Sequence, residues 1–166
     1  MTAYRARLTE TDIQRLIKAT EDDDRAEAAY KLCRSMDRAD LDERDREAAQ
    51  KILRLLANDA AELVRRAMAV TLKASDLLPI DVARRLAADI DSIALPVISA
   101  APVFSDEDLI EIVRAGSPVR QVAVAGQPRV SRDVAGVLAD VGCEQAVRML
   151  AAKHRCAAEK PGRLYR

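Results

Sequence analysis

The sequence is poor in aromatic residues and contains no tryptophan. Its 166 residues include three tyrosines, one phenylalanine and a single histidine. Ligand pockets and nucleic-acid stacking platforms are commonly built from such side chains. Classical Ser-His-Asp or Cys-His catalysis would have to use His154, which we place near the C-terminal end of a predicted helix. The composition therefore argues against an enzyme and against a protein that reads stacked bases.

Several other signals are missing as well. No apolar run approaches the roughly 18 residues that a membrane-spanning helix needs, and residues 1–16 lack the apolar core of a secretory signal. The three cysteines, Cys33, Cys143 and Cys156, are scattered and fit a reducing compartment better than a disulfide framework or a zinc site. The five glycines form no phosphate-binding loop. We expect a cytoplasmic protein with no membrane segment, no metal, no cofactor and no enzymatic activity.

What is present is a helix-forming composition. Apolar residues make up 49% of the chain and charged residues 33%, which suffices for one domain with a buried core. Alanine, leucine and arginine, which are strong helix formers, are frequent. Apolar residues recur at helical spacing, and the nearest approach to strand-like alternation, Val119–Ala125, is short. These patterns predict an all-α fold.

Capping signals divide the chain into short predicted helices. The first follows Thr9 and has an apolar face, and Ser105 stands three residues before Asp108, as in a capping box. Pro79 and Pro118 are expected at first helical positions. The predicted helices after the first cover residues 22–35, 42–57, 60–73, 79–88, 90–100, 105–115, a segment from 117, 130–141 and 143–151.

A short pattern recurs early in four of these helices. A β-branched residue is followed by a basic or small residue at Val64-Arg65, Ile93-Ala94, Val119-Arg120 and Val147-Arg148, between 26 and 29 residues apart. Two short helices and two turns fill a unit of that length. A regular period of this size is typical of an α-solenoid, in which each helix pair buries its face against its neighbours.

Residues 52–59, followed by residues 63–67, resemble a HEAT repeat. The shared features are a leucine-rich first helix, an aspartate in the turn and Val-Arg early in the second helix. Asp59 and Arg65 stand six residues apart and are the predicted structural pair of the repeat. Asp59 can cap the second helix, while Arg65 can reach acidic turn groups of a neighbouring unit. The resemblance implies a right-handed α-solenoid of short HEAT-like helix pairs.

The later units are degenerate versions of this pattern. Leu95 and Arg148 take the place of the arginine, and Arg114 stands where an aspartate would precede Arg120. Residues 86–109 and 121–126 are similar to a bacterial family of uncharacterised HEAT-like helical proteins. The two resemblances together cover about residues 42–153. They imply a fold and transfer no catalytic residue.

The resemblances suggest a simple domain organisation. We expect a single HEAT-like domain over residues 1–158, with N-terminal capping helices in residues 1–41 and repeats in residues 42–153. Residues 159–166 are expected to form a basic tail or linker.

The formal net charge is zero, but the charges are unevenly distributed. Residues 1–111 contain 17 basic and 23 acidic side chains, whereas residues 112–166 contain 10 and 4. The basic C-terminal third therefore holds the candidate partner-binding residues, which are Arg114, Arg120, Arg129, Arg132 and Arg148. A basic surface attracts acidic partners.

Two functional hypotheses follow. The first is a non-catalytic protein-interaction module that presents a helical-repeat surface to another protein, for which an acidic partner is the natural candidate. The alternative is binding of the DNA backbone through the basic C-terminal third, which zero net charge and few aromatics disfavour. Head-to-tail self-association of the acidic and basic parts is a further hypothesis about partners.

Overall fold

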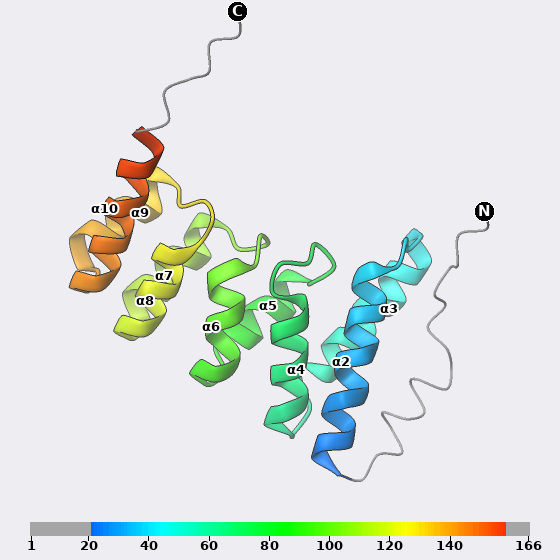
Figure 1. Cartoon of the computed structure of the whole chain (residues 1–166). Helices are drawn as coiled ribbons and strands as arrows, with labels where there is room; N and C mark the ends of the chain where they lie inside the picture. The colour runs from blue at the N-terminus through cyan, green and yellow to red at the C-terminus, as the bar shows by residue number, and fades with distance from the viewer. Residues whose placement is uncertain (1–20, 159–166) are drawn as a thin grey trace, which may run out of the picture. The chain divides into compact units, whose positions relative to one another are not determined.

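The computed structural model describes residues 21–158 and contains nine α-helices and no strand within that range (Figure 1). The predicted all-α fold is thereby confirmed for this part of the chain. None of these helices is long and apolar enough to cross a membrane. The helix predicted after Thr9, and the predicted basic tail at 159–166, lie outside the described residues.

The described residues form two compact units, and the chain passes from the first to the second between Phe104 and Ser105. The helices of the first unit are α2 (Asp22–Arg38), α3 (Glu43–Leu56), α4 (Glu62–Leu72), α5 (Ile80–Ala87) and α6 (Asp91–Ala100). The helices of the second unit are α7 (Asp106–Ala115), α8 (Pro118–Gly126), α9 (Arg132–Val141) and α10 (Glu144–Ala158).

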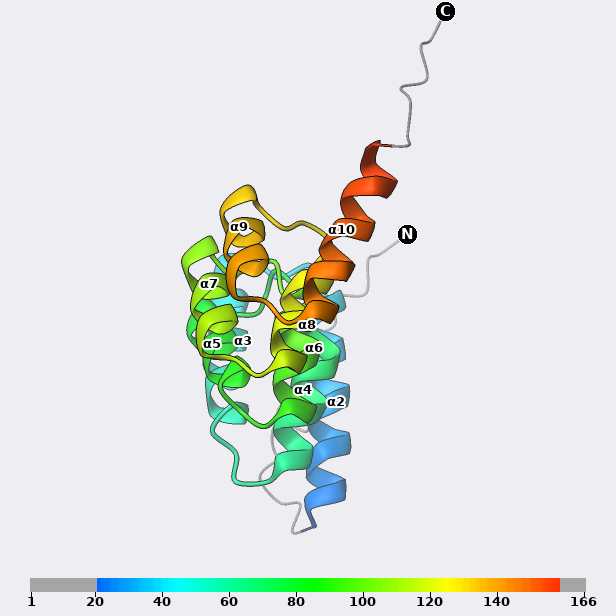
Figure 2. The same cartoon turned by 90° about the vertical axis from the view of Figure 1, so that its left-hand side faces the viewer.

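The first unit has two layers of helices. Helices α2, α4 and α6 lie side by side in one layer, and α3 and α5 lie in the other (Figures 1 and 2). Helix α4 is central, because it packs against α2 on one side and α6 on the other. Its buried face carries Val64, Met68 and Leu72. Further fully buried residues of this core are Leu53, Leu56, Leu86, Ile93 and Ile98.

The second unit is built in the same way from fewer helices. Helix α7 packs beside α9, and α8 packs beside α10 (Figure 2). Its buried residues include Val113, Val124, Val134 and Leu138. Each of these helices presents an apolar stripe at helical spacing, as the sequence predicts.

The helix starts show why the chain divides at these points. The side chain of Asp42 accepts a hydrogen bond from the backbone N–H of the third helical residue of α3, and Ser131 does the same in α9. Ser105 and Asp108 form the predicted capping box at α7. Such caps satisfy backbone donors that a helix start leaves without partners. Pro118 is the first residue of α8, as expected, but Pro79 precedes α5 and does not begin it.

Three local details refine the sequence patterns. Residues 119–125 belong entirely to α8, the helix predicted to start at Ser117-Pro118. Helix α10 continues to Ala158, four residues past His154, which is expected near the helix end. Tyr30 stands three residues before the buried Cys33 in α2, yet it is 39% exposed. Its hydroxyl accepts a hydrogen bond from Arg34 Nη1 at 2.7 Å.

Candidate interaction surface

The five arginines predicted to bind a partner are spread over the second unit. Arg114 lies on α7, Arg120 on α8, Arg132 at the start of α9 and Arg148 on α10, while Arg129 lies in the loop before α9. All are exposed except Arg120, which is half-buried. Arg114 borders an open depression along α7, whose other lining residues are Glu107, Ile110, Glu111 and Ala115.

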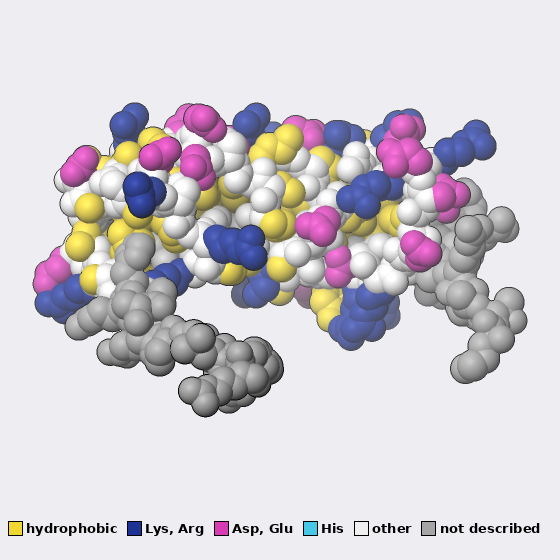
Figure 3. Space-filling view, turned by 90° about the horizontal axis from the view of Figure 1, so that it is seen from above, with side chains coloured by type: hydrophobic (Ala, Val, Ile, Leu, Met, Phe, Trp, Pro, Cys, Tyr) yellow, Lys and Arg dark blue, Asp and Glu magenta, His cyan; other side chains and the backbone are white. Residues whose placement is uncertain are grey.

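The charge around these arginines is balanced within their own unit. Residues 105–158 contain seven basic and seven acidic side chains, because α7 carries four acids among residues 106–111. Arg148 forms an exposed ion pair with Glu144 one turn away. Basic and acidic side chains are also interspersed on the face of the chain drawn in Figure 3. The acidic side chains of α7 therefore offset the basic surplus of the C-terminal third, and the second unit carries no net charge over residues 105–158.

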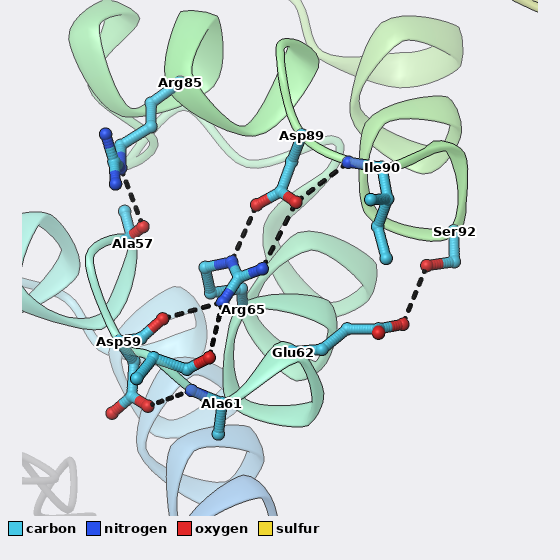
Figure 4. Close-up of polar contacts among 10 residues, drawn as sticks. Ala57, Asp59, Ala61, Glu62, Arg65, Arg85, Asp89, Ile90 and Ser92 are labelled. Atoms are coloured by element: carbon cyan, nitrogen blue, oxygen red, sulfur yellow. Dashed lines mark hydrogen bonds and ion pairs between the residues drawn. The ribbon is translucent and has the colours of Figure 1, made fainter.

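The most extensive polar network of the first unit surrounds Arg65 (Figure 4). Arg65 Nε lies 2.7 Å from Asp89 Oδ2, and its Nη2 lies 3.3 Å from Asp89 Oδ1. Arg65 Nη1 also donates to the backbone oxygens of Asp59, at 2.7 Å, and of Ala60, at 3.1 Å. The hydrogen bonds from Arg65 hold the pKa of the Asp89 carboxyl below its usual value, and Asp89 raises the pKa of Arg65.

The predicted pair of Asp59 and Arg65 is therefore joined through the main chain of Asp59. The Asp59 carboxylate accepts from the backbone N–H of Ala61, the residue before α4, at 2.8 Å. It also forms an ion pair with Arg25 of α2. The Asp59 side chain thus stabilises the turn before α4, while the charge of Arg65 is paired with Asp89 in the turn before α6.

Arg25 and Arg65 occupy the same position in their helices. Each is the fourth residue after the N-cap, which is Glu21 for α2 and Ala61 for α4. We call the fourth residue after the N-cap the bridging position of helices α2, α4, α6 and α8. Each of these two arginines reaches an aspartate in the turn before the next helix of its layer. In α6 the position is taken by Ala94, which has no polar side chain.

Gln121 occupies the bridging position of α8, four residues after Ser117. Its Nε2 donates to the backbone oxygen of Val113 at 2.9 Å and, more weakly, to that of Val141 at 3.4 Å. Its Oε1 accepts from the backbone N–H of Cys143, directly before α10, at 2.8 Å. A single amide thereby joins the end of α7 to the turn between α9 and α10.

Sequence reasoning missed Gln121. It aligned Arg120 with Arg65 because both follow a valine, which is one position too early in α8. Counting from the Ser117-Pro118 start, a signal present in the sequence, gives the correct alignment. The residue Gln121 is only 9% exposed, whereas the side chain of Arg65 keeps 17% of its surface accessible.

A second feature that the sequence reasoning did not single out is the outer face of α4. Leu63 is 39% exposed and Val70 46% exposed, and Arg66 lies exposed between them. Residues at i, i+3 and i+7 lie along one side of a helix. This side is opposite Val64 and Met68, which are fully buried. Helix α4 therefore presents two apolar side chains and one guanidinium to solvent.

The outer face of α3, in the other layer, is charged instead. Its exposed residues include Arg44, Glu47, Lys51 and Arg54, and Arg54 pairs with Asp81 of α5 at 2.7 Å. Its one large exposed apolar residue is Leu55, at 74%. The two layers of the first unit thus differ in the chemistry that they expose.

Reactive groups are sparse in the described residues. No group of three or more metal-binding side chains occurs among residues 21–158, and no buried side-chain nitrogen or oxygen in this range lacks a hydrogen-bond partner. Burial, with a smaller contribution from Asp37, raises the pKa of the Cys33 thiol to about 12. Cys143 is half-buried, and its thiol lies 3.6 Å from the Pro118 backbone oxygen.

Comparison with known proteins identifies one related family. Residues 93–158, from the third residue of α6 to the end of α10, match the model of a family described as uncharacterised protein conserved in bacteria (DUF2336). No curated protein and no solved structure matches the chain. The C-terminal part of the chain, Gln121 included, is therefore similar to a family of uncharacterised bacterial proteins.

Proposed function

We propose that this chain is a non-catalytic protein-interaction module of the cytoplasm. In this proposal each unit is a short piece of a right-handed α-solenoid made of HEAT-like helix pairs. The observation that carries it is the bridging position, at which Arg25, Arg65 and Gln121 each join their own helix to the next turn of the same layer. A repeated contact of this kind holds neighbouring helix pairs in register and keeps their outer faces available to a partner.

The partner surface of this proposal includes the exposed arginines of the second unit. Exposed guanidinium groups bind carboxylates in a planar, two-pronged geometry, which favours an acidic protein as the partner. Because their unit is electrically neutral over residues 105–158, recognition would depend on individual arginines. Long-range attraction of a polyanion would contribute little.

Affinity capture with the full chain, followed by mass spectrometry, tests this proposal. We expect recovery of a protein partner, and we expect Arg132→Glu and Arg148→Glu, at two of the exposed arginines, to reduce that recovery. Arg44→Glu, which reverses an exposed charge on α3, is the matched control and should leave capture unchanged. Failure to recover any protein at low salt would contradict the proposal.

Two further measurements separate the alternatives. A gel-shift titration with duplex DNA at low salt tests the nucleic-acid hypothesis, and a shift at micromolar protein would favour it over protein binding. Light scattering across a range of ionic strengths tests head-to-tail self-association. A mass that falls from dimer to monomer as salt is added would support it, because salt screens the attraction between acidic and basic surfaces.

A further inference from the structure

Helix α4 exposes two large apolar side chains, Leu63 and Val70, more than any other helix of the first unit. Leu63 and Val70 are separated by seven residues, or about 10 Å along the helix axis. The neighbouring helix α2 exposes Tyr30, which stands nine residues after its N-cap, as Val70 does in α4. On the other side, α6 contributes the half-buried Leu95. These residues, together with Arg66, are called the α4 face below.

The charge on this face is basic. The exposed charged residues of α4 are Glu62 and Arg66, and Lys73 follows the helix directly. Glu62 accepts a hydrogen bond from Ser92 of α6 at 3.1 Å. Arg66 forms no hydrogen bond or ion pair with residues 21–158. The centre of the face is therefore a guanidinium flanked by two apolar side chains.

This combination differs from an ordinary solvated helix surface. On α3, charges of both signs at Arg44, Glu47, Lys51 and Arg54 accompany a single large exposed apolar residue, Leu55, and Arg54 is already paired with Asp81. On α4, exposed apolar area surrounds a positive charge that has no partner within the described residues. A partner that matches both features must offer apolar side chains at helical spacing and a carboxylate between them.

We propose that the α4 face binds an amphipathic helical segment of a partner protein. In the complex, apolar side chains of that segment at i and i+7 would cover Leu63 and Val70, and an Asp or Glu near i+3 or i+4 would pair with Arg66. The proposal rests on the proposed function as an interaction module, and it names the site and the chemistry of one partner segment. The apolar contacts supply affinity, while the carboxylate fixes register and excludes basic helices.

A peptide titration on the full chain tests this assignment. The probe is a fluorescein-labelled, helix-forming 18-residue peptide with leucines along one face and glutamates flanking them. A second, control peptide carries lysine in place of every glutamate. Fluorescence anisotropy should give at least tenfold tighter binding of the glutamate peptide. We expect Val70→Asp and Arg66→Glu each to weaken that binding at least tenfold.

Matched variants on α3 separate the α4 face from a general effect of charge. Leu55→Asp places the same charge on an exposed apolar position, and Lys51→Glu makes the same charge reversal as Arg66→Glu. Both should bind the glutamate peptide within twofold of the unaltered chain. Because all four positions are exposed, the variants should keep their helical circular dichroism and their melting temperature, which is measured alongside.

Several results would overturn the proposal. These are equal binding of the two peptides, no binding of either at millimolar concentration, and equal losses in the α3 and α4 variants. Self-association of the chain that Val70→Asp abolishes would also overturn it, since the occupant would then be a second copy. If the affinity capture recovers a protein whose binding is insensitive to Val70→Asp and Arg66→Glu, this inference fails while the proposed function stands.

Discussion

The two units use different side-chain chemistry to join a helix to the turn before the next helix of its layer. In the first unit, the bridging position holds an arginine that reaches an aspartate in the next turn, as Arg65 reaches Asp89. In the second unit, it holds Gln121, which bonds only to backbone groups. Both side chains join one helix to the turn before the next helix of the layer.

The difference follows from exposure. The side chains of Arg65 and Asp89 keep 17% and 16% of their surface accessible, so their charges remain partly hydrated. Gln121 is 9% exposed and is surrounded by backbone donors and acceptors that a neutral amide satisfies from both ends. Burying a charge at such a place would cost more free energy than burying an amide. A repeat can therefore conserve the contact and change the residue.

The largest effect is expected from breaking the neutral bridge. Gln121→Leu leaves the Cys143 N–H without its acceptor and removes a donor from the Val113 and Val141 oxygens. We expect a loss of about 3 kcal/mol in the free energy of unfolding, because each unsatisfied buried group costs about 1–3 kcal/mol. Urea denaturation gives the size, and hydrogen exchange of α8 and α10 gives the location. A loss below about 1 kcal/mol would show that Gln121 is dispensable.

Breaking the charged bridge should cost somewhat less. Arg65→Met keeps the aliphatic stem but removes the bonds to Asp89 and to two backbone oxygens. We expect a loss of about 2 kcal/mol in the free energy of unfolding, because Asp89 without Arg65 can be partly hydrated and still accepts from the Ile90 N–H. Alkylation of Cys33 reports opening of the first unit, since this thiol is fully buried. With Cys143 and Cys156 replaced by serine, Cys33 should be alkylated faster in Arg65→Met than in the chain that keeps Arg65. An unchanged rate would contradict the prediction.

Acid should distinguish the two bridges. Arg65 lowers the pKa of Asp89 in the folded chain, so this pair stabilises the fold fully above the unfolded pKa of about 4. That contribution is lost as the pH falls from there through the folded pKa. Gln121 does not titrate, so its bridge should be unaffected. Hydrogen exchange at pH 6 and pH 3 should show a loss of protection around α4 and α6 that Asp89→Asn makes smaller. Equal pH sensitivity in that variant would refute the assignment.

The smallest effect is expected at the exposed ion pair between α3 and α5. Arg54 and Asp81 retain 45% and 55% of their side-chain surface accessible. Such pairs contribute little, because water and salt screen the attraction. Arg54→Ala should change the free energy of unfolding by less than about 0.5 kcal/mol, and 1 M NaCl should abolish the difference. If the free energy of unfolding falls by more than 1 kcal/mol and the loss persists in 1 M NaCl, Arg54 stabilises the fold as the bridging residues do, and the prediction is wrong.

Much of the local structure could be predicted from the sequence. Apolar spacing and caps such as Asp42, Ser105 and Ser131 located the helices, because a helix start needs a side chain to satisfy its free N–H groups. The same reasoning was less reliable at helix ends, where α10 runs on to Ala158. Fraying and the choice of end depend on packing that a sequence pattern does not contain.

The candidate site was predicted less well. The charge count directed attention to arginines of the second unit, all exposed but Arg120, which share their unit with as many acidic as basic side chains over residues 105–158. The bridging role of Gln121 was missed because its partners are backbone atoms 8, 20 and 22 residues away. The outer face of α4 was missed because Leu63 and Val70 look like core residues in a sequence.

By itself, the sequence determined that this chain forms short amphipathic helices with defined starts, because spacing and capping act within a few residues. Only the tertiary structure decided which apolar residues remain exposed and which polar side chains bridge neighbouring turns. Both outcomes depend on contacts between helices distant in sequence: Val64 is covered and Leu63 is not, although they are adjacent in the chain.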